Sequence, residues 1–314
     1  MNFPPCTRPT MLFFGVTTGQ SSSNRIFPRW AACLGLGECE LRGMDFRLHD
    51  DPQRYREAVD FLKNDPLALG ALVTTHKMDL YAACQDQLDV VEPLSASMGE
   101  VSSLCKRDGK LHARAVDPWT AGDSLAAFLP PGHWIESGAE ALILGAGGSA
   151  ISLAWHLCRA EHGTNRPGRI HAANRSLPRL EHLRRLHAGW RSGVELVCHH
   201  VAHPELADAL VHRLPPHSLV VNATGLGKDA PGSPLTNAAR FPQQGFAWDF
   251  NYRGSLVFLE QARAQQQARQ LHLEDGWVFF LHGWTQVIGD VFGVAIPGRG
   301  PVFEELSRLA LENR

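Results

Sequence analysis

The chain has 314 residues, of which 44% are hydrophobic and 20% charged, values typical of a soluble globular enzyme. This length allows two domains, each with its own core. The net charge of −2 provides no basic excess to neutralise phosphates, so a general nucleic-acid binder is excluded. No apolar run approaches the roughly 20 residues of a membrane span, so no membrane partner is expected.

The first residues lack a charged region followed by an apolar core, which argues against export. The seven cysteines are scattered and form no C-x-x-C pair, a pattern that suits reduced thiols and predicts a cytoplasmic protein. The histidines cluster only at His199-His200 and His203, where surface side chains are a better interpretation than a metal site.

Strands and helices alternate through the first part of the chain. The predicted strands are 11–16, 39–46, 68–75, 99–104 and 111–116, and the predicted helices are 25–34, 51–64, 79–88, 90–97 and 120–129. The segment from Thr17 to Asn24 is polar and contains three consecutive serines. A loop with a helix cap explains these serines, and a hydroxyl site for a small anion or polyol is the alternative. On this stretch alone the loop is favoured.

Lys77 follows directly on the strand 68–75. The carboxyl ends of strands are where α/β sheets place their ligands, although a solvated lysine at a strand end is equally compatible with this position. Asp117 follows the strand 111–116, which returns from a hairpin turn at Asp108-Gly109. The stretch Pro130-Pro131-Gly132 closes this part of the chain.

A glycine-rich turn separates a buried strand, Ala141–Leu144, from a helix that begins near Ile151. Such a turn forms the phosphate-binding corner of a dinucleotide fold, because glycines permit the tight turn and let a pyrophosphate approach bare backbone. The residues of this predicted corner are Gly145, Ala146, Gly147, Gly148, Ser149 and Ala150.

Strands and helices continue to alternate after this turn. The predicted strands are 169–174, 194–201, 217–222 and 246–252, the predicted helices between them are 177–188 and 204–212, and the closing helices are 256–270, 276–292 and 303–312. We therefore predict an α/β protein in which a Rossmann doubly wound domain, residues 131–254, binds the cofactor. The substrate domain comprises residues 1–130 and is completed by the C-terminal helices, residues 255–314.

The position after the second strand of the dinucleotide domain reads Asn174-Arg175-Ser176, with Arg179 one turn further on. NAD sites usually carry an acidic residue here to bind the ribose hydroxyls, whereas arginine suits the 2′-phosphate of NADP. We therefore expect NADP rather than NAD. The arginines of this helix also fit a solvated helix face.

Several stretches in register resemble the shikimate and quinate dehydrogenase family, from about Gly15 to Gly293. The matching segments are G-x-T-T-x-Q-S-x-S at 15–23, A-L-V-T-T-H-K at 71–77, G-E-V-S-S-L at 99–104, Asp117, G-A-G-G-S-A at 145–150, N-R-S at 174–176, N-A-T-G-L-G at 222–227, D-F-N-Y at 249–252 and D-G at 275–276 with its following helix. Each segment is modest in specificity, and the order and spacing of all nine carry the resemblance.

The resemblance implies hydride transfer between a nicotinamide cofactor and a ring alcohol. Lys77 and Asp117 would then form an acid/base pair at the reacting hydroxyl. The substrate, a small carboxylated polyol, would be bound by Ser21, Ser23, Thr74, Ser102, Tyr252 and Gln286. The remaining cofactor contacts would be Asn222, Ala223, Thr224 and Gly276.

This sequence also departs from the family pattern. The family has asparagines at the positions of Ala71 and Ser102 and a glutamine at that of Gly283, and Gln286 lies one turn beyond. Since these polar groups read ring hydroxyls, a substrate other than shikimate is favoured: quinate, an amino-substituted shikimate or another hydroxy acid. The alternatives are a true shikimate or quinate dehydrogenase with compensated contacts, and a non-catalytic NADP(H) sensor. The protein is expected to be a monomer or a homodimer.

Overall fold

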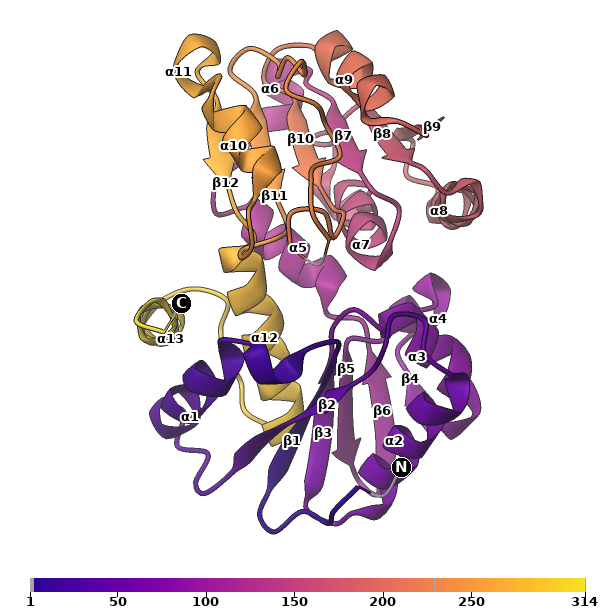
Figure 1. Cartoon of the computed structure of the whole chain (residues 1–314), viewed down its shortest axis with the longest axis vertical. Helices are drawn as coiled ribbons and strands as arrows, with labels where there is room; N and C mark the ends of the chain where they lie inside the picture. Colours follow the sequence, from indigo (N-terminus) through magenta and orange to yellow (C-terminus); the bar gives the residue numbers. More distant parts are fainter. Residues whose placement is uncertain (1–2, 229, 314) are drawn as a thin grey trace. The chain divides into compact units, whose positions relative to one another are not determined.

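The computed structural model describes residues 3–228 and 230–313, and it divides into two compact units. Unit 1 consists of residues 3–116 and 281–313, and unit 2 consists of residues 117–280. Each unit has a six-stranded sheet and its own helices (Figure 1). The predicted α/β class is confirmed. The sequence predicts a dinucleotide domain of residues 131–254. Unit 2 begins before residue 131 and ends after residue 254.

The sheet of unit 1 has the strand order β2-β1-β3-β5-β6-β4. These strands are β2 (Glu40–Asp45), β1 (Thr10–Gly15), β3 (Ala68–Val73), β5 (Ser103–Arg107), β6 (Lys110–Arg114) and β4 (Val90–Val91). The strand β1 is parallel to both β2 and β3, whereas β5 is antiparallel to β3 and β6. Because β1 is central and parallel, its residues are buried on both faces and read as a continuous apolar run.

Helices cover both faces of this sheet. The helices of unit 1 are α1 (Ser23–Cys33), α2 (Pro52–Asn64), α3 (Lys77–Cys84), α4 (Pro93–Met98), α13 (Pro301–Leu311) and the part of α12 (Trp277–Phe292) that begins at Leu281. Leu12 and Phe14 belong to the core cluster that includes Leu62 of α2. Phe13, on the opposite face of the same strand, packs edge-on against Trp284 of α12, with 5.0 Å between ring centroids.

The sheet of unit 2 is entirely parallel, in the order β12-β11-β10-β7-β8-β9. These strands are β12 (His272–Glu274), β11 (Phe246–Asp249), β10 (Leu219–Asn222), β7 (Ala141–Leu144), β8 (Arg169–Asn174) and β9 (Glu195–His200). If the strands are renumbered 1 to 6 along the chain from β7, their order in the sheet, starting at β9, is 3-2-1-4-5-6. This is the strand order of the doubly wound dinucleotide fold. The direction in which successive strands are added reverses between β7 and β10, so the ends of these two strands flank the switch point.

The helices of unit 2 connect these parallel strands or flank the sheet. They are α5 (Asp117–Leu125), α6 (His133–Ser137), α7 (Gly148–Leu157), α8 (Leu177–Trp190), α9 (Pro204–Arg213), α10 (Val257–Arg263), α11 (Gln266–Arg269) and the first turn of α12. The core joins β7 and β10 to α9 and α10 through residues such as Leu144, Val220, Val211 and Phe258. No helix in the described part of the chain is long and apolar enough to cross a membrane.

Three predicted elements differ from those observed. The predicted helix 256–270 is two short helices followed by the edge strand β12. The predicted helix 90–97 begins with the two-residue strand β4, and the predicted strand 99–104 is displaced to β5. The strands β4 and β12 form by pairing with β6 and β11, and local propensity does not predict such contacts.

Candidate functional site

The glycine-rich turn of unit 2 has the form that the sequence predicts. Gly145 follows β7 with a φ of +129°, a conformation that favours glycine. A Cβ at Gly145 would lie 2.6 Å from the carbonyl oxygen of Ala223, so the turn also requires glycine to pack against the β10 loop. Gly147 then precedes α7, whose first residues are Gly148, Ser149 and the fully buried Ala150. Backbone N–H groups at this helix start suit a pyrophosphate.

Arg179 belongs to the first turn of α8, which follows β8. A Cβ at Gly147 would lie 3.7 Å from its Nη1 atom, so this guanidinium faces the glycine-rich turn. Arg175 is exposed and its N–H bonds the side chain of Asn174 (3.0 Å), while Ser176 precedes α8. His200 of β9 contacts the carbonyl oxygen of Arg175 (3.1 Å). Of the basic groups expected to suit a 2′-phosphate, Arg179 lies beside the glycine-rich turn.

The loop after β10 is held by side chains. Asn222 is fully buried, and its Oδ1 accepts hydrogen bonds from the N–H (3.0 Å) and hydroxyl (2.6 Å) of Thr224. The Nδ2 of Asn222 donates to Oδ1 of Asp249 (3.1 Å). Asp249 is also fully buried, and burial raises the pKa of its carboxyl to about 7. Its Oδ2 has no hydrogen-bond partner among the described residues, as suits a carboxyl that keeps its proton.

Tyr252 and Gly276 also lie in unit 2, as does Asp117. The Tyr252 ring packs against Phe280 with 4.6 Å between centroids. A Cβ at Gly276 would lie 2.0 Å from the carbonyl oxygen of Phe250, so this backbone contact requires glycine. Asp117 is buried at the start of α5.

Unit 1 contains the serine segment. Ser21 and Ser23 are both buried, and their hydroxyl oxygens lie 2.7 Å apart. Asp45 at the end of β2 fixes the segment, because its Oδ1 accepts from the N–H (2.8 Å) and hydroxyl (2.5 Å) of Thr18. Gly43 of β2 leaves room for this approach, since a Cβ there would overlap the Thr18 hydroxyl. The segment forms a 3₁₀ helix at Thr18–Gln20 and then enters α1, but the residue before α1, Ser22, makes no capping hydrogen bond with its side chain, so the expected helix cap is not observed. The hydroxyl site for an anion or polyol stays a prediction.

Lys77 is the first residue of α3, just past the end of β3 and half-buried. The preceding residue, His76, is fully buried, and its Nδ1 lies 3.0 Å from the hydroxyl of Tyr55. Burial lowers the pKa of His76, which favours the neutral ring. The His76–Tyr55 contact fixes the start of α3 and thereby the backbone of Lys77. Thr74, also at this strand end, donates its hydroxyl to the Phe14 carbonyl (3.0 Å).

Ser102 is buried and its hydroxyl serves the backbone. Its Oγ accepts from the Val116 N–H (2.8 Å), directly before Asp117, and its N–H donates to the Arg114 carbonyl (3.0 Å). Ser102 thus fixes the segment that leads to Asp117.

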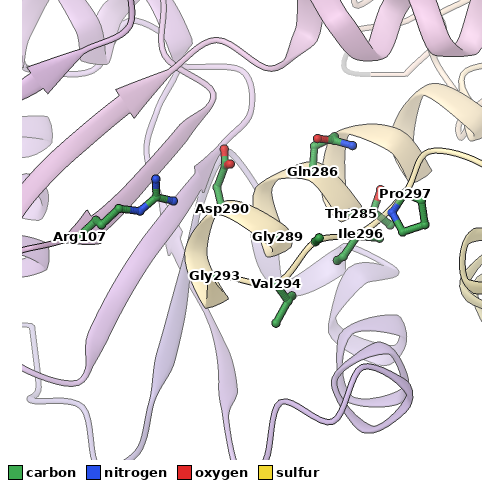
Figure 2. A pocket seen from close by; sticks show the side chains of 10 residues that line it. Arg107, Thr285, Gln286, Gly289, Asp290, Gly293, Val294, Ile296 and Pro297 are labelled. Carbon is green, nitrogen blue, oxygen red and sulfur yellow. The ribbon is translucent and has the colours of Figure 1, made fainter.

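Gln286 is a half-buried residue of α12 that lines an open cavity of about 490 Å³ in unit 1 (Figure 2). The other lining residues are Arg107, Thr285, Gly289, Asp290, Gly293, Val294, Ala295, Ile296 and Pro297. Both carboxylate oxygens of Asp290 already have partners in the protein. One pairs with Arg114 (2.9 Å), and the other accepts from the Ser103 hydroxyl (3.0 Å). Gln286 and the residues near the carboxyl end of β3 lie in the same unit, whereas Asp117 and Tyr252 lie in the other.

Three residues that support the site were not singled out from the sequence: Asp45, His76 and Asn251. Asp45 could have been found, because β1 and β2 are parallel and Gly15 pairs with Asp45 at their carboxyl ends. His76 and Asn251 carry no signal in the sequence, since only their buried contacts distinguish them.

These features define a two-unit α/β protein with a dinucleotide-type sheet and glycine-rich turn. No protein-family model matches the chain. A curated shikimate dehydrogenase (NADP⁺) from Symbiobacterium thermophilum is 30% identical over 205 residues, which are 65% of this chain and 64% of that protein. A second, from Streptococcus thermophilus, is 28% identical over 182 residues, or 57% and 59% of the two chains. The alignments thus span less than two thirds of these relatives.

A solved structure covers nearly the whole chain. The shikimate 5-dehydrogenase of Thermus thermophilus, in complex with NADP(H) and shikimate, has a TM-score of 0.68 at 23% identity, covering 96% of this chain and 99% of that one. This protein therefore has the shikimate dehydrogenase fold. Together with the two relatives, this confirms the predicted resemblance to the shikimate and quinate dehydrogenase family.

Proposed function

We propose that this protein is an NADP-dependent oxidoreductase of the shikimate dehydrogenase type. The observation that carries the proposal is the glycine-rich turn of a parallel 3-2-1-4-5-6 sheet, with Arg179 facing Gly147. The open backbone at Gly147 fits a pyrophosphate, and the guanidinium fits a 2′-phosphate. When bound, NADP would supply the hydride acceptor for an alcohol substrate, and Gly145–Ala150, Asn174–Ser176 and Arg179 would hold it.

The substrate class we propose is a carboxylated cyclitol, oxidised at a ring hydroxyl. Ser21 and Ser23 would donate to its carboxylate, with Thr74 and Tyr252 as further contacts, because several oriented donors compensate a carboxylate for lost water. Lys77 would accept the alcohol proton, and Asp117 would orient the amine. This assignment rests on the sequence resemblance, supported by the buried contacts that fix the backbone beside each residue.

Two observations favour an altered substrate over shikimate itself. A Cβ at Gly283 would meet no atom within 4 Å, so the position of the family's glutamine is open. The Ser102 hydroxyl, at the position of a family asparagine, is engaged by the Val116 N–H. A substrate with fewer ring hydroxyls to read, or with a larger substituent, suits these changes. A true shikimate or quinate dehydrogenase would need Gln286 to replace these contacts.

The test is NADP⁺ reduction, followed by the absorbance of NADPH, with shikimate, quinate and related hydroxy acids, and with NAD⁺ in parallel. Turnover of a relative but not of shikimate is the expected result. Robust shikimate turnover would mean that the substituted contacts are compensated. Tight NADPH binding without turnover of any compound would contradict the enzymatic proposal and favour a sensor.

The cytoplasmic location remains a proposal. It is supported by the seven cysteines, all of which are free thiols in the described structure.

A further inference from the structure

Asn251 is a buried residue just past the end of β11, and only 4% of its surface is exposed. It lies between Asp249 and Tyr252, at a position that the D-x-x-Y pattern leaves open. No direct contact with substrate or cofactor is assigned to it above. Burial of an amide costs free energy unless its donors and acceptor find partners, so the contacts of Asn251 indicate what it holds.

The side chain of Asn251 holds the loop that follows β10. Its Nδ2 donates to two carbonyl oxygens of this loop, those of Thr224 (3.1 Å) and Leu226 (3.1 Å). Its backbone N–H donates to Oδ1 of Asp249 (2.9 Å), and its carbonyl accepts from the N–H of Gly276 (3.1 Å). One residue therefore joins the loop, the end of β11 and the start of α12.

The loop is also held from its other side. Asn222 accepts from the N–H and hydroxyl of Thr224, and the hydroxyl oxygen of Thr224 in turn accepts from the N–H of Leu226 (3.2 Å). The next carbonyl, that of Ala223, lies against Gly145, where a Cβ would be only 2.6 Å away. Any movement of the loop therefore changes the wall of the glycine-rich turn.

Only an amide suits the position of Asn251. Its nitrogen has two N–H donors, one for each loop carbonyl, and carries no charge. A carboxylate would turn acceptors toward the two carbonyl oxygens, and an aliphatic side chain would leave both carbonyls without this partner.

The strand order indicates which half of a dinucleotide meets this loop. The ends of β8 and β9, with Arg175, Arg179 and His200, lie on one side of β7, and the ends of β10 and β11 lie on the other. A dinucleotide binds across this switch point. If the arginines hold the 2′-phosphate of the adenosine half, the Ala223–Gly227 loop meets the nicotinamide half.

We propose that Asn251 is a positioning residue for the nicotinamide half of bound NADP, and that it acts through the Ala223–Gly227 loop. This inference rests on the proposed NADP-dependent function. It predicts that loss of the amide weakens binding of the whole dinucleotide but not of a fragment that contains only the adenosine half.

The experiment compares two ligands on the full-length protein with Asn251→Leu. The dissociation constant of NADPH, measured by its fluorescence, should rise about tenfold, while that of 2′,5′-ADP, measured by calorimetry, should stay unchanged. If Asn251→Leu does not fold, the smaller Asn251→Ser change gives the same comparison with a smaller expected shift.

A matched control is Gln265→Leu, which removes another amide of unit 2. Gln265 donates to the carbonyl of Ala239 (2.8 Å) and accepts from the N–H of Phe241 (3.2 Å), away from the assigned cofactor residues. This variant should bind both ligands normally. Equal losses for NADPH and 2′,5′-ADP in the Asn251 variants, or no loss, would overturn the inference alone. A wild-type protein that binds neither NADPH nor 2′,5′-ADP would overturn the proposed function as well.

Discussion

The two compact units differ in how much of their candidate site follows the family pattern. In unit 2 the glycine-rich turn is intact, and Gly145 is required both by its positive φ and by the close carbonyl of Ala223. In unit 1 the polar positions expected to read a substrate have changed to Ala71, Ser102 and Gly283. The cofactor side depends on a backbone conformation at Gly145 that few substitutions preserve. The substrate side depends on side chains, which can change with the substrate.

The residues around the two sites also differ. The β10 loop of unit 2 is held by a buried network of Asn222, Asp249 and Asn251. The serine segment of unit 1 is held by the carboxylate of Asp45, by the side chain of Asn24, which donates to the Thr18 carbonyl (2.9 Å), and by contact between its own hydroxyls.

The largest expected effect is on Lys77. Lys77→Ala should lower kcat by roughly 10²- to 10⁴-fold, because a positioned general base contributes about this much, while NADPH binding by unit 2 is unchanged. Steady-state kinetics and NADPH fluorescence measure both quantities. Lys110→Ala, at the exposed first residue of β6, is the control and should retain turnover. Retained turnover in the Lys77 variant would remove its assigned role.

The buried carboxyl of Asp249 is expected to make stability depend on pH. Its pKa is raised by burial from 3.8 to about 7, so the folded state holds the proton more tightly than the unfolded state. The stability that the proton provides is fully present below the pKa of the unfolded state, and it is lost as pH rises through the pKa of the folded state. The side chain of Asp249→Asn cannot titrate. As pH rises between the two pKa values, the unfolding free energy of this variant should therefore increase by about 4 kcal/mol relative to that of the wild type.

Urea unfolding of both proteins between about pH 4 and pH 8 measures this difference. Parallel stability curves would contradict a protonated Asp249. The bonds that Asn222 and the Asn251 N–H donate to Oδ1 should survive in the variant, because an amide oxygen accepts them equally well.

Arg179 tests whether the cofactor side discriminates NADP from NAD. Arg179→Gln should weaken NADP⁺ binding by about tenfold to a hundredfold, the usual range for losing one charge-assisted contact, and should leave NAD⁺ binding unchanged. Calorimetry with both cofactors gives the ratio. Arg184→Gln is the matched control, since Arg184 pairs with Glu181 on the exposed face of the same helix. Equal effects of the two substitutions would show that the helix acts only through its overall charge.

The smallest expected effect concerns the altered substrate side. Gly283→Gln restores the amide expected from the family pattern at a position with open space, and it should raise kcat/KM for shikimate by about tenfold. It should also stabilise α12 by roughly 1 kcal/mol, because glycine is a poor residue inside a helix. A substrate without the corresponding ring hydroxyls provides the control. A gain for that substrate as well would indicate a stability effect rather than a new contact.

The sequence predicted the α/β class and most strands and helices, because apolar runs and helical periodicity are local patterns. It also predicted the conformation at Gly145–Gly147, since a strand, a glycine-rich turn and a helix in succession leave few alternatives. The short edge strand β12 was not predicted, because His272–Glu274 forms a strand only by pairing with β11.

The amino-acid sequence by itself determined the order of elements, the glycine-rich turn and the positions at which this chain departs from its relatives. Only the tertiary structure decided that the Ser102 hydroxyl binds the Val116 N–H, that Arg179 faces Gly147, and that Asn251 holds the loop of Thr224 and Leu226. These contacts join residues separated by 14 to 32 positions in the chain. Hydrogen bonds between such distant residues depend on sheet register and burial, which local sequence patterns do not specify.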